Sequence, residues 1–201
     1  VSIDINDQQK VLWKKCKKEV LSDFTILDKK KFWEKYLDRN SIGDIFNYYK
    51  QFKLLLRLEI VKYLKNKFNE QFILIGDDWT NFSINSLSSN FNPNYIKRLY
   101  KGNICIDFGS AEGSSSLYPR SNGIIEAGGL ILQSKQIDSM DIWGNLENKI
   151  TFKNYNDLEI IIQKLLNNQH LSKDILSDIS KNFENSKSLI EKNFDQIFKN
   201  I

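Results

Sequence analysis

The fold is decided by residues 104–132, which read ICIDFGSAEGSSSLYPRSNGIIEAGGLIL. An apolar run at 104–106 enters a loop of small residues, and a helix predicted over 119–127 leads to a second apolar run at 130–132. A Pro at the start of that helix and Gly128-Gly129 just past its end fit the usual punctuation of helices. The stretch therefore predicts a strand, a loop, a helix and a second strand.

Four apolar runs share one property, because each is continuous rather than alternating. They are 72–75, 104–106, 130–132 and 150–152. Continuous runs are typical of strands that are covered on both faces, as in parallel sheets. With helices predicted after Pro93 and after Pro119, the element order is βαβαβ. We expect an α/β fold over residues 70–201, namely a Rossmann-like parallel sheet with helices on both faces, preceded by a helical segment.

Helical periodicity dominates the two ends of the chain. Residues 1–69 predict a helical N-terminal segment, in which apolar side chains recur every three or four residues from Ile45 to Phe68, with the Lys and Arg side chains largely elsewhere. After Phe152, three further apolar stripes predict three C-terminal helices. These stripes lie at 158–166, 175–183 and 189–198.

The composition limits the class of protein. The chain has 201 residues, 41% of them hydrophobic, which excludes wholesale disorder and leaves no room for two complete catalytic lobes. Its 29 basic and 25 acidic residues give a net charge of +4 without a long basic block, so we expect no nucleic-acid partner. Cys16 and Cys105 lack metal-ligand spacing, and no apolar stretch is long enough for a transmembrane segment. We find no signal peptide, so the expected localisation is cytoplasmic, and a start at Val1 fits a processed chain or a piece of a longer one.

The loop and helix that follow the second predicted strand have the geometry that binds phosphate. Ligands of open parallel sheets lie beyond the carboxyl ends of the strands, where a helix N-terminus offers unpaired N–H groups. Ser114, Ser115 and Ser116 are small enough for the backbone to approach an oxygen, and Arg120 adds a permanently charged, bidentate donor. Glu126, on the same helix, has the acceptors that ribose hydroxyls need. The alternative is a plain surface loop with an ion-paired arginine and a solvated glutamate.

A set of motifs in a fixed order carries a family resemblance. They are Gly76-Asp77-Asp78-Trp79 after the first predicted strand, Tyr95 to Lys101 before the second, Tyr118-Pro119-Arg120-Ser121, and residues 124–132, which read IIEAGGLIL. The region from about Arg57 to Phe198 resembles the donor-binding C-terminal domain of GT-B glycosyltransferases, especially the CgeB-like bacterial group. The resemblance implies a nucleotide-sugar donor whose ribose meets Glu126 and whose diphosphate lies near the start of the helix.

The resemblance also implies site residues. Arg120 would bind the donor and act in catalysis, and Ser114 to Ser116, Tyr118 and Glu126 would complete the donor site. The implied enzyme is a metal-independent glycosyltransferase that needs no cofactor and takes part in bacterial glycan or surface polysaccharide synthesis. Its acceptor is unidentified. An inverting reaction would need a catalytic base, which in this family usually comes from the N-terminal lobe, and that lobe or a partner protein is the expected partner of this chain.

The chain departs from related families in one respect. Retaining members often carry two glutamates separated by seven residues, but position 118 is Tyr, so the stereochemical outcome stays open. No Asp-x-Asp metal motif occurs, and we expect Asp77 and Asp78 to serve in a turn and as a helix cap rather than as metal ligands. Trp79 is a candidate for stacking on a base or sugar. The alternative function is a non-catalytic nucleotide-binding or protein-interaction module.

Overall fold

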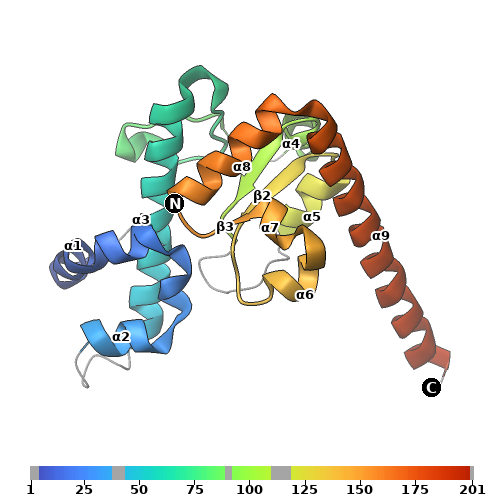
Figure 1. The fold of residues 1–201 in the computed structure, drawn as a ribbon. Helices are drawn as coiled ribbons and strands as arrows, with labels where there is room; N and C mark the ends of the chain where they lie inside the picture. Colours follow the sequence, from blue (N-terminus) through green and yellow to red (C-terminus); the bar gives the residue numbers. More distant parts are fainter. Residues whose placement is uncertain (1–4, 38–43, 89–91, 110–118, 200–201) are drawn as a thin grey trace.

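The structure, a computed structural model, describes residues 5–37, 44–88, 92–109 and 119–199. Most of these residues are helical, and a small parallel sheet lies among the helices (Figure 1). The helices are α1 Asp7–Ser22, α2 Lys30–Tyr36, α3 Ile45–Phe68, α4 Pro93–Tyr100, α5 Pro119–Glu126, α6 Ser139–Trp143, α7 Glu147–Ile150, α8 Tyr155–Asn167 and α9 Gln169–Lys199. The strands are β1 Ile104–Asp107, β2 Leu130–Ser134 and β3 Thr151–Phe152. Short 3-10 helices span Phe24–Asp28, Asn69–Gln71, Trp79–Phe82 and Gly144–Leu146.

The helices predicted within residues 1–69 are confirmed as α1, α2 and α3. A capping box starts α1, because the N–H of Gln9 donates to the Asn6 side chain at 2.8 Å and the N–H of Asn6 donates to the Gln9 side chain at 3.0 Å. Trp13 of α1 then packs edge-on against Phe52 of α3, with ring centroids 5.1 Å apart. This contact packs α1 against α3, the long helix that precedes the sheet in the chain.

The predicted parallel sheet is confirmed with three strands in the order β1-β2-β3. Ile104 pairs with Leu130 at one end of the β1-β2 ladder, and Gln133 pairs with Thr151 in the β2-β3 ladder. Every residue of β2 is buried, as expected for a central strand covered on both faces. β1 is an edge strand, and its carboxyl end is where the candidate site lies.

One hydrophobic core joins the N-terminal helices to the sheet. The cluster of buried side chains extends from Trp13 in α1 through β2 to Ile179 in α9. Polar contacts support the same packing, since the Tyr63 hydroxyl of α3 donates to Glu159 of α8 and the Lys67 ammonium lies 2.9 Å from the same carboxylate. The helix α3 is therefore packed into the α/β region and contributes side chains to it.

The prediction that 72–75 forms a strand of the sheet is wrong for this structure. The segment is extended, but only Ile75 makes a bridge, and its partner is Leu87. The N–H of Leu87 donates to the Leu74 carbonyl at 2.8 Å, and the N–H of Gly76 donates to the Leu87 carbonyl at 2.9 Å. The backbone of this apolar run thus pairs with a neighbouring loop, and the sheet begins at β1.

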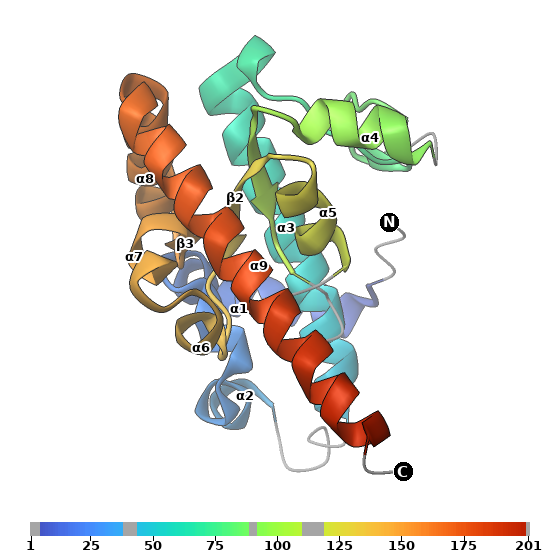
Figure 2. The same cartoon turned by 90° about the vertical axis from the view of Figure 1, so that its right-hand side faces the viewer.

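The prediction of three C-terminal helices is also wrong, because the structure has two. α8 covers the first apolar stripe, and α9 runs without a break through the other two as a helix of 31 residues. No Gly or Pro interrupts residues 169–199, so nothing in the local sequence ends the helix between the stripes. Figures 1 and 2 show α9 passing beside the sheet, and Figure 1 shows its C-terminal half extending away from the other elements.

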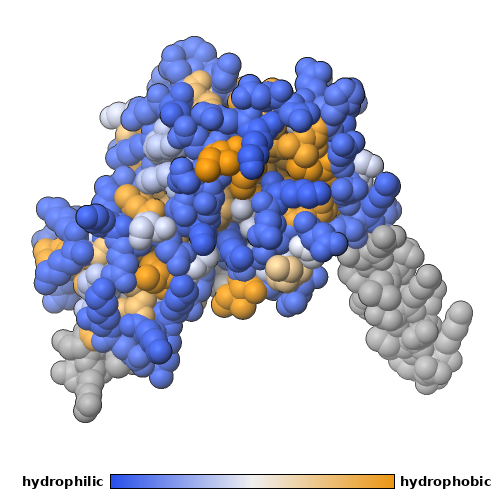
Figure 3. Space-filling view, in the orientation of Figure 1, coloured by the Kyte–Doolittle hydropathy of each residue, from blue (hydrophilic) through white to orange (hydrophobic). Residues whose placement is uncertain are grey.

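The surface is mainly hydrophilic on the face drawn in Figure 3, with apolar side chains in several separate spots. Ile73, Ile137 and Leu166 are among the exposed large apolar residues. None of the helices that the structure describes combines the length and the apolar character needed to cross a membrane.

Candidate functional site

The site is centred on Asp107, the last residue of β1. The strand carries this carboxylate into the interior, where the side chain is 0% exposed. Two nearby donors of the same chain bind this carboxylate: the backbone N–H of Gly109 at 3.0 Å and the hydroxyl of Ser121 at 2.5 Å. A buried carboxylate needs such donors, because desolvation without hydrogen bonds is costly.

Arg120, in the first turn of α5, supplies the charge that balances Asp107. Its Nε and Nη2 atoms lie 3.0 and 2.5 Å from Oδ1 of Asp107. The Arg120 side chain is 40% exposed, whereas its partner is 0% exposed. The guanidinium therefore connects a buried carboxylate with the solvent, and its outer part faces the space in front of the sheet edge.

A second arginine, Arg57 from the middle of α3, reaches the same point. Nη2 of Arg57 and Nη2 of Arg120 each donate to the carbonyl oxygen of Gly109, both at 3.1 Å. The Arg57 guanidinium also lies over the Phe108 ring, with Cζ 5.9 Å from the centroid. Two guanidiniums that share one acceptor oxygen lie close together, so α3 and α5 place two cations at the carboxyl end of β1.

The electrostatics of this pair favour an added negative charge. Burial, and then the positive charge of Arg120, lower the pKa of Arg57 to about 10, while the nearby Asp107 opposes this shift. The Nε atom of Arg57 is buried and has no hydrogen-bond partner. Among these three groups, two positive charges face one negative charge. An anion beside the guanidiniums would reduce their mutual repulsion.

A chain of buried hydrogen bonds supports Asp107 from the sheet side. The Gln133 amide nitrogen of β2 lies 3.5 Å from the Ser121 hydroxyl, which in turn donates to Asp107. The indole N–H of Trp143 donates to Oε1 of Gln133 at 3.0 Å. All four side chains are buried, so the position of the carboxylate is set by the packed interior.

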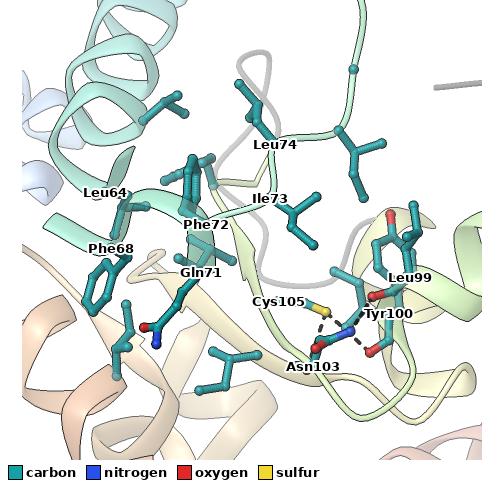
Figure 4. Close-up of a pocket in the computed structure, with 18 of the residues that line it drawn as sticks. Leu64, Phe68, Gln71, Phe72, Ile73, Leu74, Leu99, Tyr100, Asn103 and Cys105 are labelled. Carbon is teal, nitrogen blue, oxygen red and sulfur yellow. Dashed lines mark hydrogen bonds between the residues drawn. The ribbon is translucent and has the colours of Figure 1, made fainter. Parts of the chain in front are cut away.

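A cavity of about 970 Å³ opens beside the arginine pair. It lies between the C-terminal half of α3, the segment 72–79, and the outer edge of β1 (Figure 4). Its walls are largely apolar, with Leu64, Phe72 and Ile106 among them. Arg57 and Arg120 line the same cavity, so a ligand there would meet both cations and an apolar wall.

The residues predicted for the donor site fall into three groups. Arg120 lines the cavity. Glu126 is exposed and is not part of the cavity lining. Six residues at about 100° each place Glu126 about 120° around the helix from Arg120, which explains why the two side chains do not meet. Ser114 to Ser116 and Tyr118 lie outside the described residues.

Two residues of this site, Arg57 and Asp107, were not among those predicted from the sequence. Arg57 gave no local signal, because it lies on the polar side of an apolar stripe in a segment treated as separate. Asp107 did offer a signal, since a carboxylate that directly ends a buried apolar strand has to be paired or hydrogen-bonded. Both residues become significant through contacts with Arg120 and Gly109.

The Gly76-Asp77-Asp78 segment also borders the cavity. Asp78 has φ +69°, which agrees with the predicted turn, but its side chain makes no capping hydrogen bond to the 3-10 helix that follows. Trp79 is 7% exposed and lines the same cavity, so its aromatic ring adds to the apolar wall. Within the described parts of the chain, no group of three or more His, Cys, Asp or Glu side chains is arranged to hold a metal ion.

Comparisons with protein-family models, with curated proteins and with solved structures each gave no match. Fold and site together define a mostly helical α/β protein with a cationic site at the carboxyl end of a parallel edge strand.

Proposed function

We propose that this chain binds a phosphate-bearing ligand at the Arg57–Arg120 pair, and that the ligand is the nucleotide-sugar donor of a glycosyltransferase. One observation carries the proposal: two guanidiniums converge on the carbonyl oxygen of Gly109, at 3.1 Å each, where β1 ends. Planar guanidiniums bind phosphate through two parallel N–H donors, and they keep their charge at neutral pH.

The position of the pair agrees with this ligand. In parallel sheets, ligands lie beyond the carboxyl ends of the strands, and α5 begins directly after the loop that follows β1. The cavity supplies an apolar wall beside the cations. We further propose that the three-stranded sheet belongs to a Rossmann-like fold with helices on both faces, and that this chain forms the donor-binding half of the enzyme.

The arrangement has a direct chemical use in sugar transfer. As the bond between the sugar and the diphosphate breaks, negative charge grows on the leaving group, and fixed donors aimed at that charge lower the barrier. Arg120 is suited to this role because its guanidinium is anchored on Asp107 and 40% exposed. In the proposed enzyme, no metal is required, and an inverting reaction would take the base that activates the acceptor from another domain.

Some predicted residues enter the proposal and one does not. Ser114 to Ser116 and Tyr118 would add donors from the loop between β1 and α5. The ribose contact that the resemblance implies for Glu126 stays a prediction, and its exposed position outside the cavity gives it no support.

Thermal unfolding with a panel of phosphates tests the proposal. Inorganic pyrophosphate and at least one nucleoside diphosphate should raise Tm, whereas the matching nucleoside should not. A ligand present at 100 times its Kd stabilises by about 2.7 kcal/mol. In a chain of this size, that corresponds to a rise of roughly 5–11 °C.

Matched variants assign the effect to the site. Arg57→Lys and Arg120→Lys keep the charge next to Asp107 but lose the planar donor pair, so each should weaken pyrophosphate binding at least about tenfold. Arg98→Lys, on the exposed face of α4, should bind like the wild type, and so should Glu126→Gln. If no phosphate compound raises Tm, or if the site variants bind as Arg98→Lys does, the assignment fails. Donor binding without any sugar transfer, measured with a full-length protein, would favour the non-catalytic module.

A further inference from the structure

Within the described residues, no strand pairs with the outer edge of β1. The N–H of Leu130 donates to the Asn103 carbonyl at 2.9 Å, and Ile104 is the register partner of Leu130. In a parallel ladder this pattern turns the backbone groups of Cys105 toward β2 and those of Ile104 and Ile106 toward the outer edge. That edge faces the cavity described above.

Residues 72–75, here called the strap, present the complementary pattern across the cavity. The strap pairs with Leu87 through the Leu74 carbonyl and the Gly76 N–H, which occupy one of its edges. The N–H and C=O groups of Ile73 and Ile75 therefore point to the opposite edge. Among the backbone hydrogen bonds described for the strap, none joins it to β1.

The side chains of the strap and of β1 match face by face. Phe72 and Leu74 pack against the cluster that contains Val61 of α3. Phe108, directly after β1, packs against the same cluster, and Ile104 and Ile106 share its side of the strand. Even-numbered residues of both segments thus lie on the α3 side.

The odd-numbered residues lie on the other side. Cys105 faces α5, because a Cβ on Gly129 would meet its sulfur at 3.1 Å. Figure 4 shows the Ile73 side chain pointing from the strap into the cavity, toward Cys105, Leu99 and Tyr100. Ile73 is 58% exposed, so its side chain is available to pack against another surface.

We propose that the strap docks on β1 as a fourth parallel strand, with Ile73 opposite Cys105. The outward N–H of Ile106 then donates to the Ile73 carbonyl, and the N–H of Ile75 donates to the Ile106 carbonyl, which continues the alternation of a parallel ladder. A shift by one residue would turn Ile73 to the α3 side and is excluded by the face match.

Docking has a consequence for the cationic site. It closes the cavity and aligns Asp77, two residues beyond Ile75, with Gly109, two residues beyond Asp107. Docking thereby brings the carboxylates of Asp77 and Asp78 to the carboxyl end of β1, where the arginine pair lies. The strap is therefore a closing element whose docked state withdraws the arginine pair from a phosphate ligand, whereas the undocked state leaves the pair open to the cavity.

A thiol pair tests the register in the full chain. Ile73→Cys places a thiol beside Cys105, and mild oxidation followed by peptide mapping should find this disulfide in most molecules. Leu74→Cys is the matched control, because its side chain lies on the α3 side, and it should bridge to Cys105 at least about tenfold less. A bridge from Leu74→Cys but not from Ile73→Cys would overturn the proposed register.

Amide hydrogen exchange of the wild-type protein tests the pairing itself. Because the structure shows the strap apart from β1, docking is partial, and the N–H groups of Ile75 and Ile106 should exchange at least about tenfold more slowly than unprotected amides but faster than the Cys105 amide within the sheet. Exchange of both within about twofold of the unprotected rate would refute the proposal, even if the thiols react. If the protection of the Ile106 amide rises with protein concentration and Ile73→Cys forms no disulfide with Cys105, the outer edge of β1 pairs with another chain instead of with the strap. These measurements use ligand-free protein, so their outcome is independent of phosphate binding.

Discussion

Arg120→Ala is the most direct test of the charge arrangement at the end of β1. The change removes the two hydrogen bonds to Asp107 and the one to the Gly109 carbonyl. Breaking a buried pair by removing one partner costs about 3–5 kcal/mol, but Arg120 is 40% exposed, and solvent screening reduces the value. The Ser121 hydroxyl and the Gly109 N–H still hold the carboxylate. We therefore expect a loss of about 2–4 kcal/mol in the free energy of unfolding.

Urea denaturation followed by tryptophan fluorescence measures this loss, and a thermal melt gives a second reading. In a chain of this size, the expected change lowers Tm by roughly 4–16 °C. Arg98→Ala is the control, because this arginine is exposed on α4 and bonds the Asn94 carbonyl at 3.3 Å; it should change stability by less than about 0.5 kcal/mol. If Arg120→Ala unfolds at the same urea concentration as Arg98→Ala, the pairing of Arg120 with Asp107 is refuted.

Three further predictions concern packing and pH. Gly129→Ala should lower the free energy of unfolding by about 1–3 kcal/mol, because the added Cβ would lie 2.9 Å from the last carbonyl oxygen of α4. Gly123→Ala should raise the free energy of unfolding by about 0.5–1 kcal/mol, because nothing lies within 4 Å of the added Cβ. Equal shifts of the two urea midpoints would contradict this prediction. Trp143→Phe removes the 3.0 Å hydrogen bond to the buried Gln133 and should lower the free energy of unfolding by about 1–3 kcal/mol in the same urea assay. A change near zero would contradict this prediction. Burial and a hydrogen bond to a carboxylate of α8 raise the pKa of Tyr63 to about 12, so its contribution to stability is present below pH 10 and is lost as the pH rises toward 12. Urea titrations over that range should show a shallower decline for Tyr63→Phe, and an unchanged slope would count against the raised pKa.

Local signals were sufficient to predict most helices. The helices predicted after Pro93 and Pro119 begin at these prolines as α4 and α5, because proline favours the first helical position. The apolar spacing of α3 is equally local. Such signals act within about one turn of helix, so they can be read before the tertiary structure is known.

The site could be predicted only in part. Arg120 stood out because it follows a loop of small residues at a predicted helix start. Arg57 could not be found in the same way, because its partner Gly109 lies 52 residues away on another element. The position of Glu126 depends on how α5 is rotated against the sheet, and this rotation is set by packing on β1 and β2.

The sequence by itself determined most of the helices and the positions of β1, β2 and β3, since hydrophobic periodicity and caps depend on neighbours within a few residues. Only the tertiary structure decided that 72–75 stands apart from the sheet and that Arg57 and Arg120 meet at one carbonyl oxygen. The physical reason is the same in both cases. A strand needs a partner for its backbone groups, and the effect of a charge depends on its distance from other charges and on its burial, which are properties of the folded chain.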